Sequence, residues 1–136
     1  MHLNRLKQNT KNVIEPTRQR KSITEKQRTG DAGEALALRY LQRHRLTLVA
    51  SNFCCKGGEI DLVMQNGAAL VFVEVRQRTL GRHGSAADSI TRSKQKRLIV
   101  AAHIYLQRYR YPPACRFDVV AIDGAVITWL QNVIDS

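Results

Sequence analysis

The middle of the chain carries the pattern that decides its fold, EIDLVMQNGAALVFVEVRQ, residues 59–77. Two β-rich runs, one ending at Gln65 and the other beginning at Ala68, flank the dipeptide Asn66-Gly67. That dipeptide favours a two-residue type I′ hairpin turn. The stretch therefore predicts an antiparallel hairpin with Gln65 opposite Ala68.

Period-two alternation in this register separates an acidic face of the hairpin from an apolar one. Asp61 then lies opposite Phe72, and Asp61 and Glu74 become diagonal neighbours about 7–8 Å apart at Cα. Two carboxylates at that separation can close on one divalent cation, and Mg²⁺ prefers such hard oxygen ligands. The alternative is that Glu59 and Glu74 are exposed strand acids paired with Arg76 or Arg78. The apolar face is predicted to hold Ile60, Leu62, Met64, Val71, Val73 and Val75.

The flanking sequence predicts one helix before this hairpin and one after it. In the first helix, Asp31 and Glu34 have the spacing of a capping box. The chain order is α-β-β-β-α-β-β, which predicts an α/β domain with a mixed sheet flanked by helices. The predicted elements are a helix over roughly 31–45, strands Leu46–Phe53, Glu59–Gln65 and Ala68–Gln77, a loop Thr79–Ala87, a helix over 88–110, and strands Arg116–Ile122 and Ala125–Leu130 joined across Asp123-Gly124.

The composition indicates one basic domain. The 136 residues suit a single core, and the formal net charge of +11 makes polyanions, nucleic acid above all, the natural partners. Residues 1–28 are polar and basic and predict a disordered arm, with the ordered domain over 29–136. The sequence shows no secretory signal or membrane span, and three cysteines without a disulfide or zinc pattern. A cytoplasmic protein without a membrane partner is expected.

Several side chains of the second helix complete the candidate site. Lys94 lies on its apolar stripe, one turn before the core-facing residues, and so aims toward the sheet, with Gln95 on its flank. The alternative for Lys94 is a snorkelling surface lysine. The cations expected to contact phosphate are Arg78, Arg82, Arg92, Lys96 and Arg97.

Five short motifs, in this order, resemble the YraN-like family of bacterial proteins. The resemblance runs from about Thr29 to Trp129, nearly all of the predicted domain. That family is similar to archaeal Holliday-junction resolvases and belongs with the PD-(D/E)xK nuclease superfamily. The motifs are Gly30-Asp31-Ala32-Gly33-Glu34, Gly58-Glu59-Ile60-Asp61-Leu62-Val63, Val71-Phe72-Val73-Glu74-Val75-Arg76, Ser93-Lys94-Gln95 and Arg116-Phe117-Asp118-Val119-Val120.

The resemblance implies a restriction-endonuclease-like mixed central sheet and a site for Mg²⁺ or Mn²⁺. By position, Asp61 and Glu74 would hold the metal, Glu34 would support it, and Gln95 would match a helix glutamine of related nucleases. One departure concerns Arg76, which stands where the ExK motif has lysine. Arginine keeps the charge but is a poor proton carrier, so Lys94 is the candidate for a displaced lysine.

The implied function is a metal-dependent endonuclease that hydrolyses phosphodiester bonds in DNA, with branched DNA as one candidate substrate. The alternative is a non-catalytic nucleic-acid-binding domain with a decayed nuclease site. A junction resolvase would need a homodimer in order to cut two strands.

Overall fold

The computed structural model describes residues 25–78 and 90–134, and in these ranges the predicted order of elements is confirmed. The predicted loop Thr79–Ala87, with Arg82, lies outside them, as does the predicted arm up to residue 24. The last four residues of that arm, 25–28, belong to the first helix. The elements are α2 (Glu25–Arg43), β1 (Thr47–Cys55), β2 (Gly58–Asn66), β3 (Ala69–Arg78), α3 (Arg92–Leu106), β4 (Cys115–Asp123) and β5 (Val126–Leu130).

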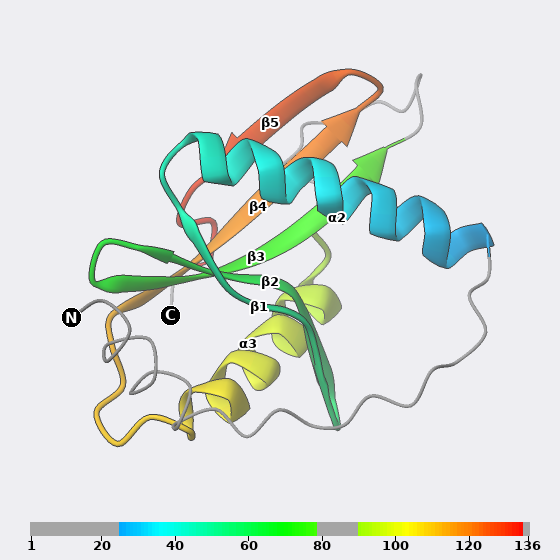
Figure 1. The fold of residues 1–136 in the computed structure, drawn as a ribbon. Coiled ribbons are helices and arrows are strands. Elements are labelled where there is room, and N and C mark those ends of the chain that lie inside the picture. Colours follow the sequence, from blue (N-terminus) through cyan, green and yellow to red (C-terminus); the bar gives the residue numbers. More distant parts are fainter. Residues whose placement is uncertain (1–24, 79–89, 135–136) are drawn as a thin grey trace.

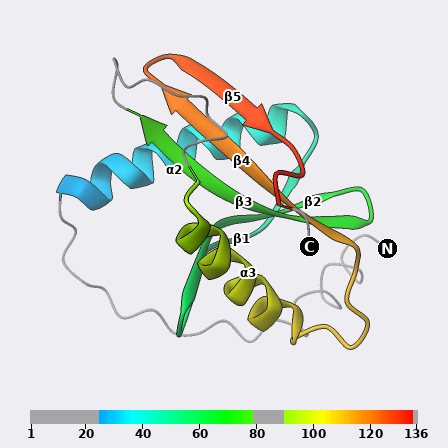
Figure 2. The same cartoon turned by 180° about the vertical axis from the view of Figure 1, so that it is seen from behind.

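The five strands form one mixed sheet in the order β1-β2-β3-β4-β5. Neighbouring strands are antiparallel except β3 and β4, which are parallel and are connected through α3. Helix α2 covers one face of the sheet and α3 covers the other, as the two opposite views show (Figures 1 and 2). The prediction of an α/β domain with a mixed sheet between helices is confirmed.

Each face of the sheet has its own apolar core, because side chains alternate between the faces along each strand. The expected partition holds with one exception. Ile60 was predicted beside Leu62 but packs in the core under α3, since the start of β2 lies directly against that helix. The core under α3 includes Val63, Phe72, Leu98, Ala101, Tyr105 and Phe117, and the core under α2 includes Ala37, Leu41, Leu62, Met64, Val71, Val73 and Val120.

The register of the central hairpin differs from the prediction by two residues. Asn66 pairs with Ala69, so the loop is Gly67-Ala68 and not Asn66-Gly67. Gly67 has a φ of 61°, whereas Asn66 and Ala68 are not among the residues with positive φ. A positive φ at the first loop residue alone is the type II′ pattern, which places glycine first. The second hairpin is shifted in the same way, with Gly124 (φ 58°) first in its loop.

A shift of two residues preserves which side chains share a face. The recorded pairs between β2 and β3 end at Leu62 and Val73. Asp61 and Glu74 lie just beyond this end of the ladder, where the Val75 N–H donates to the Asp61 side chain.

Both helices begin at different residues from those predicted. Helix α2 begins at Glu25, so Asp31 lies within it and the capping-box interpretation is wrong. Helix α3 begins after its N-cap Thr91, whose hydroxyl accepts a hydrogen bond from the Lys94 N–H at 3.3 Å. That cap defines the start of the helix four residues later than residue 88. Its end at Leu106 comes four residues before the predicted end at 110.

Gly58, the first residue of β2, lets α3 approach the sheet very closely. A β-carbon added there would lie 2.0 Å from the Arg97 carbonyl oxygen and 3.0 Å from the Ala101 nitrogen. No other residue type fits without moving the helix. The contact fixes the middle of α3, Arg97 to Ala101, against the start of β2.

Candidate functional site

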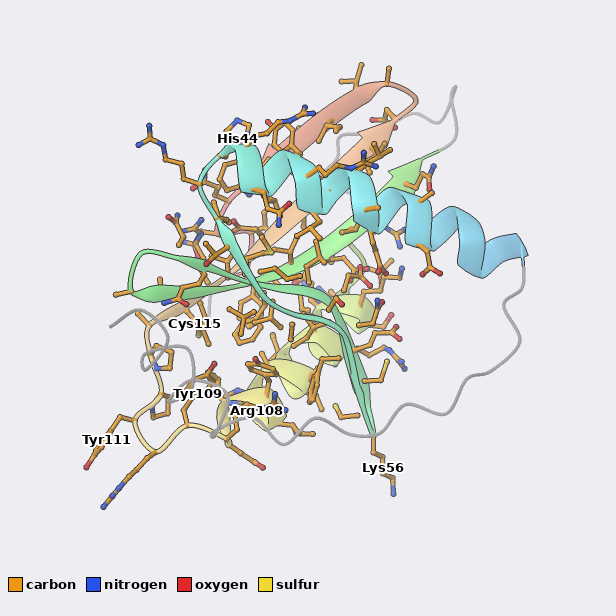
Figure 3. The ribbon with its side chains drawn as sticks, viewed as in Figure 1. His44, Lys56, Arg108, Tyr109, Tyr111 and Cys115 are labelled. Carbon is orange, nitrogen blue, oxygen red and sulfur yellow. The ribbon has the colours of Figure 1, made fainter. Side chains whose placement is uncertain are left out.

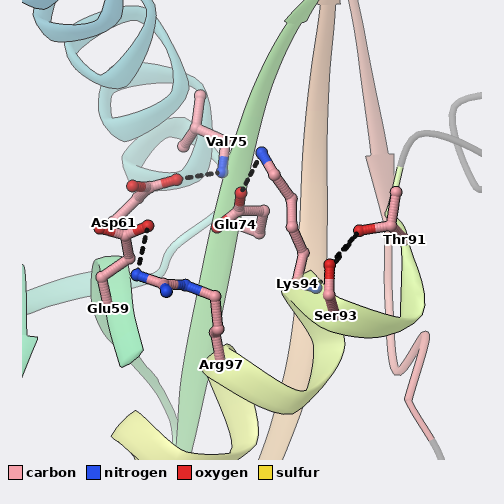
Figure 4. A network of polar contacts seen from close by, with 8 residues as sticks. All are labelled: Glu59, Asp61, Glu74, Val75, Thr91, Ser93, Lys94 and Arg97. Carbon is pink, nitrogen blue, oxygen red and sulfur yellow. Dashed lines mark hydrogen bonds and ion pairs between the residues drawn. The ribbon is translucent and has the colours of Figure 1, made fainter. Parts of the chain in front are cut away.

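Two carboxylates from adjacent strands form the centre of the candidate site. Glu74 on β3 lies on the sheet face that α3 covers, where its side chain is only 15% exposed, and Asp61 on β2 lies close enough to interact with it. The Val75 N–H donates a hydrogen bond to Asp61 Oδ2 at 2.8 Å (Figure 4). Because the pairing of β2 with β3 is recorded only as far as Leu62 and Val73, this side chain satisfies a backbone donor just beyond that point.

The two carboxylates share one electrostatic environment. Burial, followed by the charge of Asp61, raises the pKa of Glu74 from 4.5 to about 8, although Lys94 and Arg76 oppose the rise. Burial also raises the pKa of Asp61, against hydrogen bonds from Val75 and Glu74. Such a pair titrates as a unit, so at neutral pH the metal-free pair retains a proton, which we assign to Glu74.

Helix α3 brings two cations to the acids of the sheet. Lys94 Nζ lies 3.8 Å from Glu74 Oε1, and Arg97 Nη2 lies 3.6 Å from Glu59 Oε1 (Figure 4). The two cations are three residues apart and therefore share one side of the helix. Lys94 is 43% exposed, so its ion pair with Glu74 adds little stability and leaves the ammonium free to move. The hollow between these elements has a volume of about 200 Å³ and is lined by Glu59, Glu74, Ser93, Lys94 and Arg97.

Arg76, two residues beyond Glu74 on β3, is half-buried beside this pair. Its charge lowers the pKa of Glu74. Its Nε is buried and makes no hydrogen bond within the described part of the chain. A buried donor without a partner costs free energy, so Arg76 retains a donor that an additional acceptor could satisfy.

The structure does not assemble the full predicted set of site residues. Glu34 lies half-buried on α2, which packs on the other face of the sheet. Across residues 25–78 and 90–134, no group of three or more His, Cys, Asp or Glu side chains could hold a metal ion. The Gln95 amide donates to the Ile90 carbonyl at 3.4 Å, a local contact at the start of α3.

The predicted phosphate-binding cations are placed in part. Arg92, Lys96 and Arg97 are exposed on α3, on the same helix as Lys94. The backbone of Arg78 ends β3, and its side chain is outside the described part of the structure, as is Arg82.

Two residues that the sequence analysis did not assign to the site line the hollow. Glu59 shares its period-two face with Asp61, so the alternation was a usable signal for it. Ser93 precedes Lys94, and its hydroxyl lies 3.2 Å from that of the N-cap residue Thr91. No sequence pattern could have identified the Val75 N–H as the partner of Asp61, because that contact depends on where strand pairing ends.

Fold and site together define a three-layer α/β domain with a half-buried carboxylate pair beside a helix-borne lysine. A family model described as uncharacterised protein family UPF0102 matches residues 33–122. The chain belongs to this UPF0102 family, which is the YraN-like family of the sequence resemblance.

Relatives in other bacteria match most of the chain. A UPF0102 protein of Herminiimonas arsenicoxydans is 61% identical over 121 residues, covering 89% of this chain and 98% of its own. One from Janthinobacterium is also 61% identical, over 113 residues, covering 83% of this chain and 92% of its own. One from Pseudomonas fluorescens is 49% identical over 118 residues, covering 81% and 95%. In the described part of this chain, neither helix is long and apolar enough to cross a membrane.

Proposed function

We propose that this protein is a metal-dependent endonuclease that hydrolyses phosphodiester bonds in DNA, with branched DNA among its candidate substrates. The observation that carries the proposal is the half-buried pair of Asp61 and Glu74, with the Lys94 ammonium 3.8 Å from Glu74 Oε1. Burial first, and the charge of Asp61 second, raise the pKa of Glu74. Acids are unfavourable in strand interiors, and perturbed carboxylates in a hollow are typical of functional sites.

The donor set fits Mg²⁺ or Mn²⁺. Asp61 and Glu74 offer hard carboxylate oxygens, and Mg²⁺ commonly uses one or two carboxylates together with phosphate and water. A divalent cation would replace the proton on Glu74 and neutralise both charges. When bound, the metal polarises the phosphate and lowers the pKa of a water molecule.

The remaining side chains would act on the phosphate itself. The Lys94 ammonium lies within reach of Glu74, and it can stabilise the negative charge that develops on a scissile phosphate or carry a proton. Arg76 can supply its unpaired Nε as a fixed donor to the same phosphate but cannot transfer a proton readily. Glu34 and Gln95 would act at most by supporting these groups.

The charge of the molecule favours DNA as the partner. Arg97 lines the hollow, Arg92 and Lys96 are exposed on the same helix, and the chain carries a net charge of +11. Such a surface attracts the phosphate backbone irrespective of sequence. A cytoplasmic location and a homodimer for paired cuts on junctions are part of the proposal.

The test compares nicking of junction, flap and linear DNA in Mg²⁺ or Mn²⁺ by wild type and Asp61→Asn. Since Asp61 would hold the metal, we expect the variant to lose cleavage by about 100-fold or more, while DNA binding in EDTA is retained. Glu59→Gln is the control, because Glu59 is an exposed acid of the same hollow. Equal cleavage by wild type and Asp61→Asn would overturn the proposal.

A second candidate function is DNA binding without catalysis. Two observations favour it: Arg76 stands where the nuclease motif has lysine, and the described residues contain no three-ligand metal group. Mg²⁺-dependent thermal stabilisation of wild type, absent in Asp61→Asn, together with no cleavage of any substrate, would support this alternative.

A further inference from the structure

The far end of α3 carries a cluster of aromatic and arginine side chains, built around the sequence Arg108-Tyr109-Arg110-Tyr111. The Arg108 guanidinium carbon lies 3.9 Å from the centre of the Tyr105 ring and 5.1 Å from that of Phe53. Tyr109 packs against Tyr105 with ring centres 6.1 Å apart. These contacts hold Arg108 and Tyr109 against the α3-side core, next to the end of the helix (Figure 3).

Tyr111 differs from its neighbours because its ring is presented to solvent. It is 81% exposed, the most exposed of the large hydrophobic side chains of the described residues, and it points away from the ribbon (Figure 3). The Arg110 guanidinium carbon lies 5.7 Å from its ring centre. Pro112 and Pro113 follow it directly, and a residue before proline has restricted backbone angles. The ring is therefore exposed on a stiff segment.

The charged residues in the sequence segment around Tyr111 are all cations, of which Lys94, Arg97 and Arg116 pair with acids of the strands. Residues 89–117 contain no Asp or Glu, so nothing in this segment of sequence offsets its cations. Contact with an apolar protein surface would remove water from these cations, and contact with a basic surface would bring like charges together, so neither partner suits this ring. It suits a ligand with a flat π-face and a negative backbone. The cations of the segment are Arg92, Lys94, Lys96, Arg97, Arg108, Arg110 and Arg116.

We propose that Tyr111, with Arg110 beside it, is a stacking platform for an unpaired base of single-stranded DNA. The base would lie on the Tyr111 ring, and Arg110 and Arg108 would contact the adjacent phosphates. This proposal rests on the proposed function, because it specifies DNA with a single-stranded region as the substrate class. Binding of the base does not require cleavage.

Lys94 lies near the start of α3, and the platform follows its end. From Lys94 to Leu106, α3 rises about 18 Å at 1.5 Å per residue, and Tyr111 follows five residues later. At about 3.4 Å per nucleotide of a stacked strand, the helix alone corresponds to about five nucleotides. One strand can therefore contact both ends of α3 at once.

The test is fluorescence anisotropy with labelled single-stranded oligonucleotides in EDTA, where no cutting occurs. Loss of stacking on one base costs about five-fold or more in affinity, so Tyr111→Ala should weaken binding of an intact strand by at least that factor. Tyr111→Phe should retain it, because the ring remains. Oligonucleotides without bases should bind wild type and Tyr111→Ala equally. Val126→Ala, which truncates another exposed apolar side chain, is the matched control.

The outcomes separate this platform from the nuclease proposal. An equal loss on intact and base-free strands, or no loss on either, would overturn the platform even if the protein cuts DNA. Tyr111-dependent binding without any metal-dependent cutting would support the platform and remove the nuclease. Failure to bind single-stranded DNA at all would remove the platform, while cutting of duplex substrates would still test the site at Asp61 and Glu74.

Discussion

At the scale of single residues, Glu74 links the acid pair to protein stability. Its pKa of about 8 in the folded protein exceeds its usual value of 4.5. The folded state thus retains a proton that the unfolded chain releases. This contribution to the free energy of unfolding is fully present below pH 4.5 and is lost as the pH rises through about 8.

Glu74→Gln should remove this pH dependence, because an amide cannot ionise. In EDTA at pH 8.5 we expect the melting temperature of the variant to exceed that of wild type by about 5 °C, with little difference at pH 5. Added Mg²⁺ should stabilise wild type alone, and more strongly at higher pH, since binding displaces a proton. Glu59→Gln is the control, and identical melting curves at pH 8.5 would show that the pair carries no shared proton.

The role of Lys94 in the reaction can be distinguished experimentally from the role of cations that only bind the DNA phosphates. If the protein cuts DNA, Lys94→Ala should lower the rate more than about tenfold with little change in DNA affinity, since its ammonium would act on the reacting phosphate. Lys96→Ala, an exposed neighbour, should weaken affinity instead. The measurements are single-turnover cleavage and binding in EDTA. Equal losses in rate and affinity for Lys94→Ala would reduce its role to phosphate contact.

The closeness of the two acids was predictable from the sequence because they lie on the paired strands of one hairpin. Asp61 and Glu74 share a face in any register shifted by an even number of residues. The register itself was not predictable, since Asn-Gly favours one turn type while Gly67 is used in another, type II′. The position of Glu34 depends on how α2 packs, which short-range patterns do not determine.

At the scale of elements, the contact between Gly58 and α3 fixes the site. Gly58→Ala should destabilise the protein by about 3 kcal/mol in urea unfolding, because the new methyl group meets the backbone of Arg97. Gly33→Ala in α2 is a matched control, since its methyl group would meet the flexible end of Gln77 at 3.0 Å and Ile122 Cδ1 at an ordinary contact distance of 3.8 Å. Equal stability of the two variants would contradict the close packing of α3.

The order of elements and the mixed sheet followed from the sequence, whereas helix ends did not. The cap at Thr91 had no distinctive pattern, because Ser and Thr recur throughout residues 85–93. The missed start of α2 at Glu25 lies in a polar stretch without the apolar period that indicates a packed helix.

At the scale of the whole molecule, binding to DNA should fall steeply with salt. Each neutralised phosphate contributes a slope of about −0.9 in log K against log salt. Lys96→Ala and Arg92→Ala should each make the slope shallower by about one unit, if α3 faces the duplex. Arg39→Ala, an exposed cation on α2, should leave it unchanged. A slope that changes equally for all three would indicate diffuse attraction without a DNA-binding face.

The close packing at Gly58 holds α3 at a fixed position against β2. Lys94 lies near the start of the helix and Tyr111 follows its end, so the separation of these two residues is fixed as well. If both ends engage one strand, incisions will fall at a constant offset from the base seated on Tyr111, irrespective of sequence. Sequencing of the cut ends would then show a single spacing between the stacked base and the incision. A helix that could move against the sheet would give fragments of several lengths.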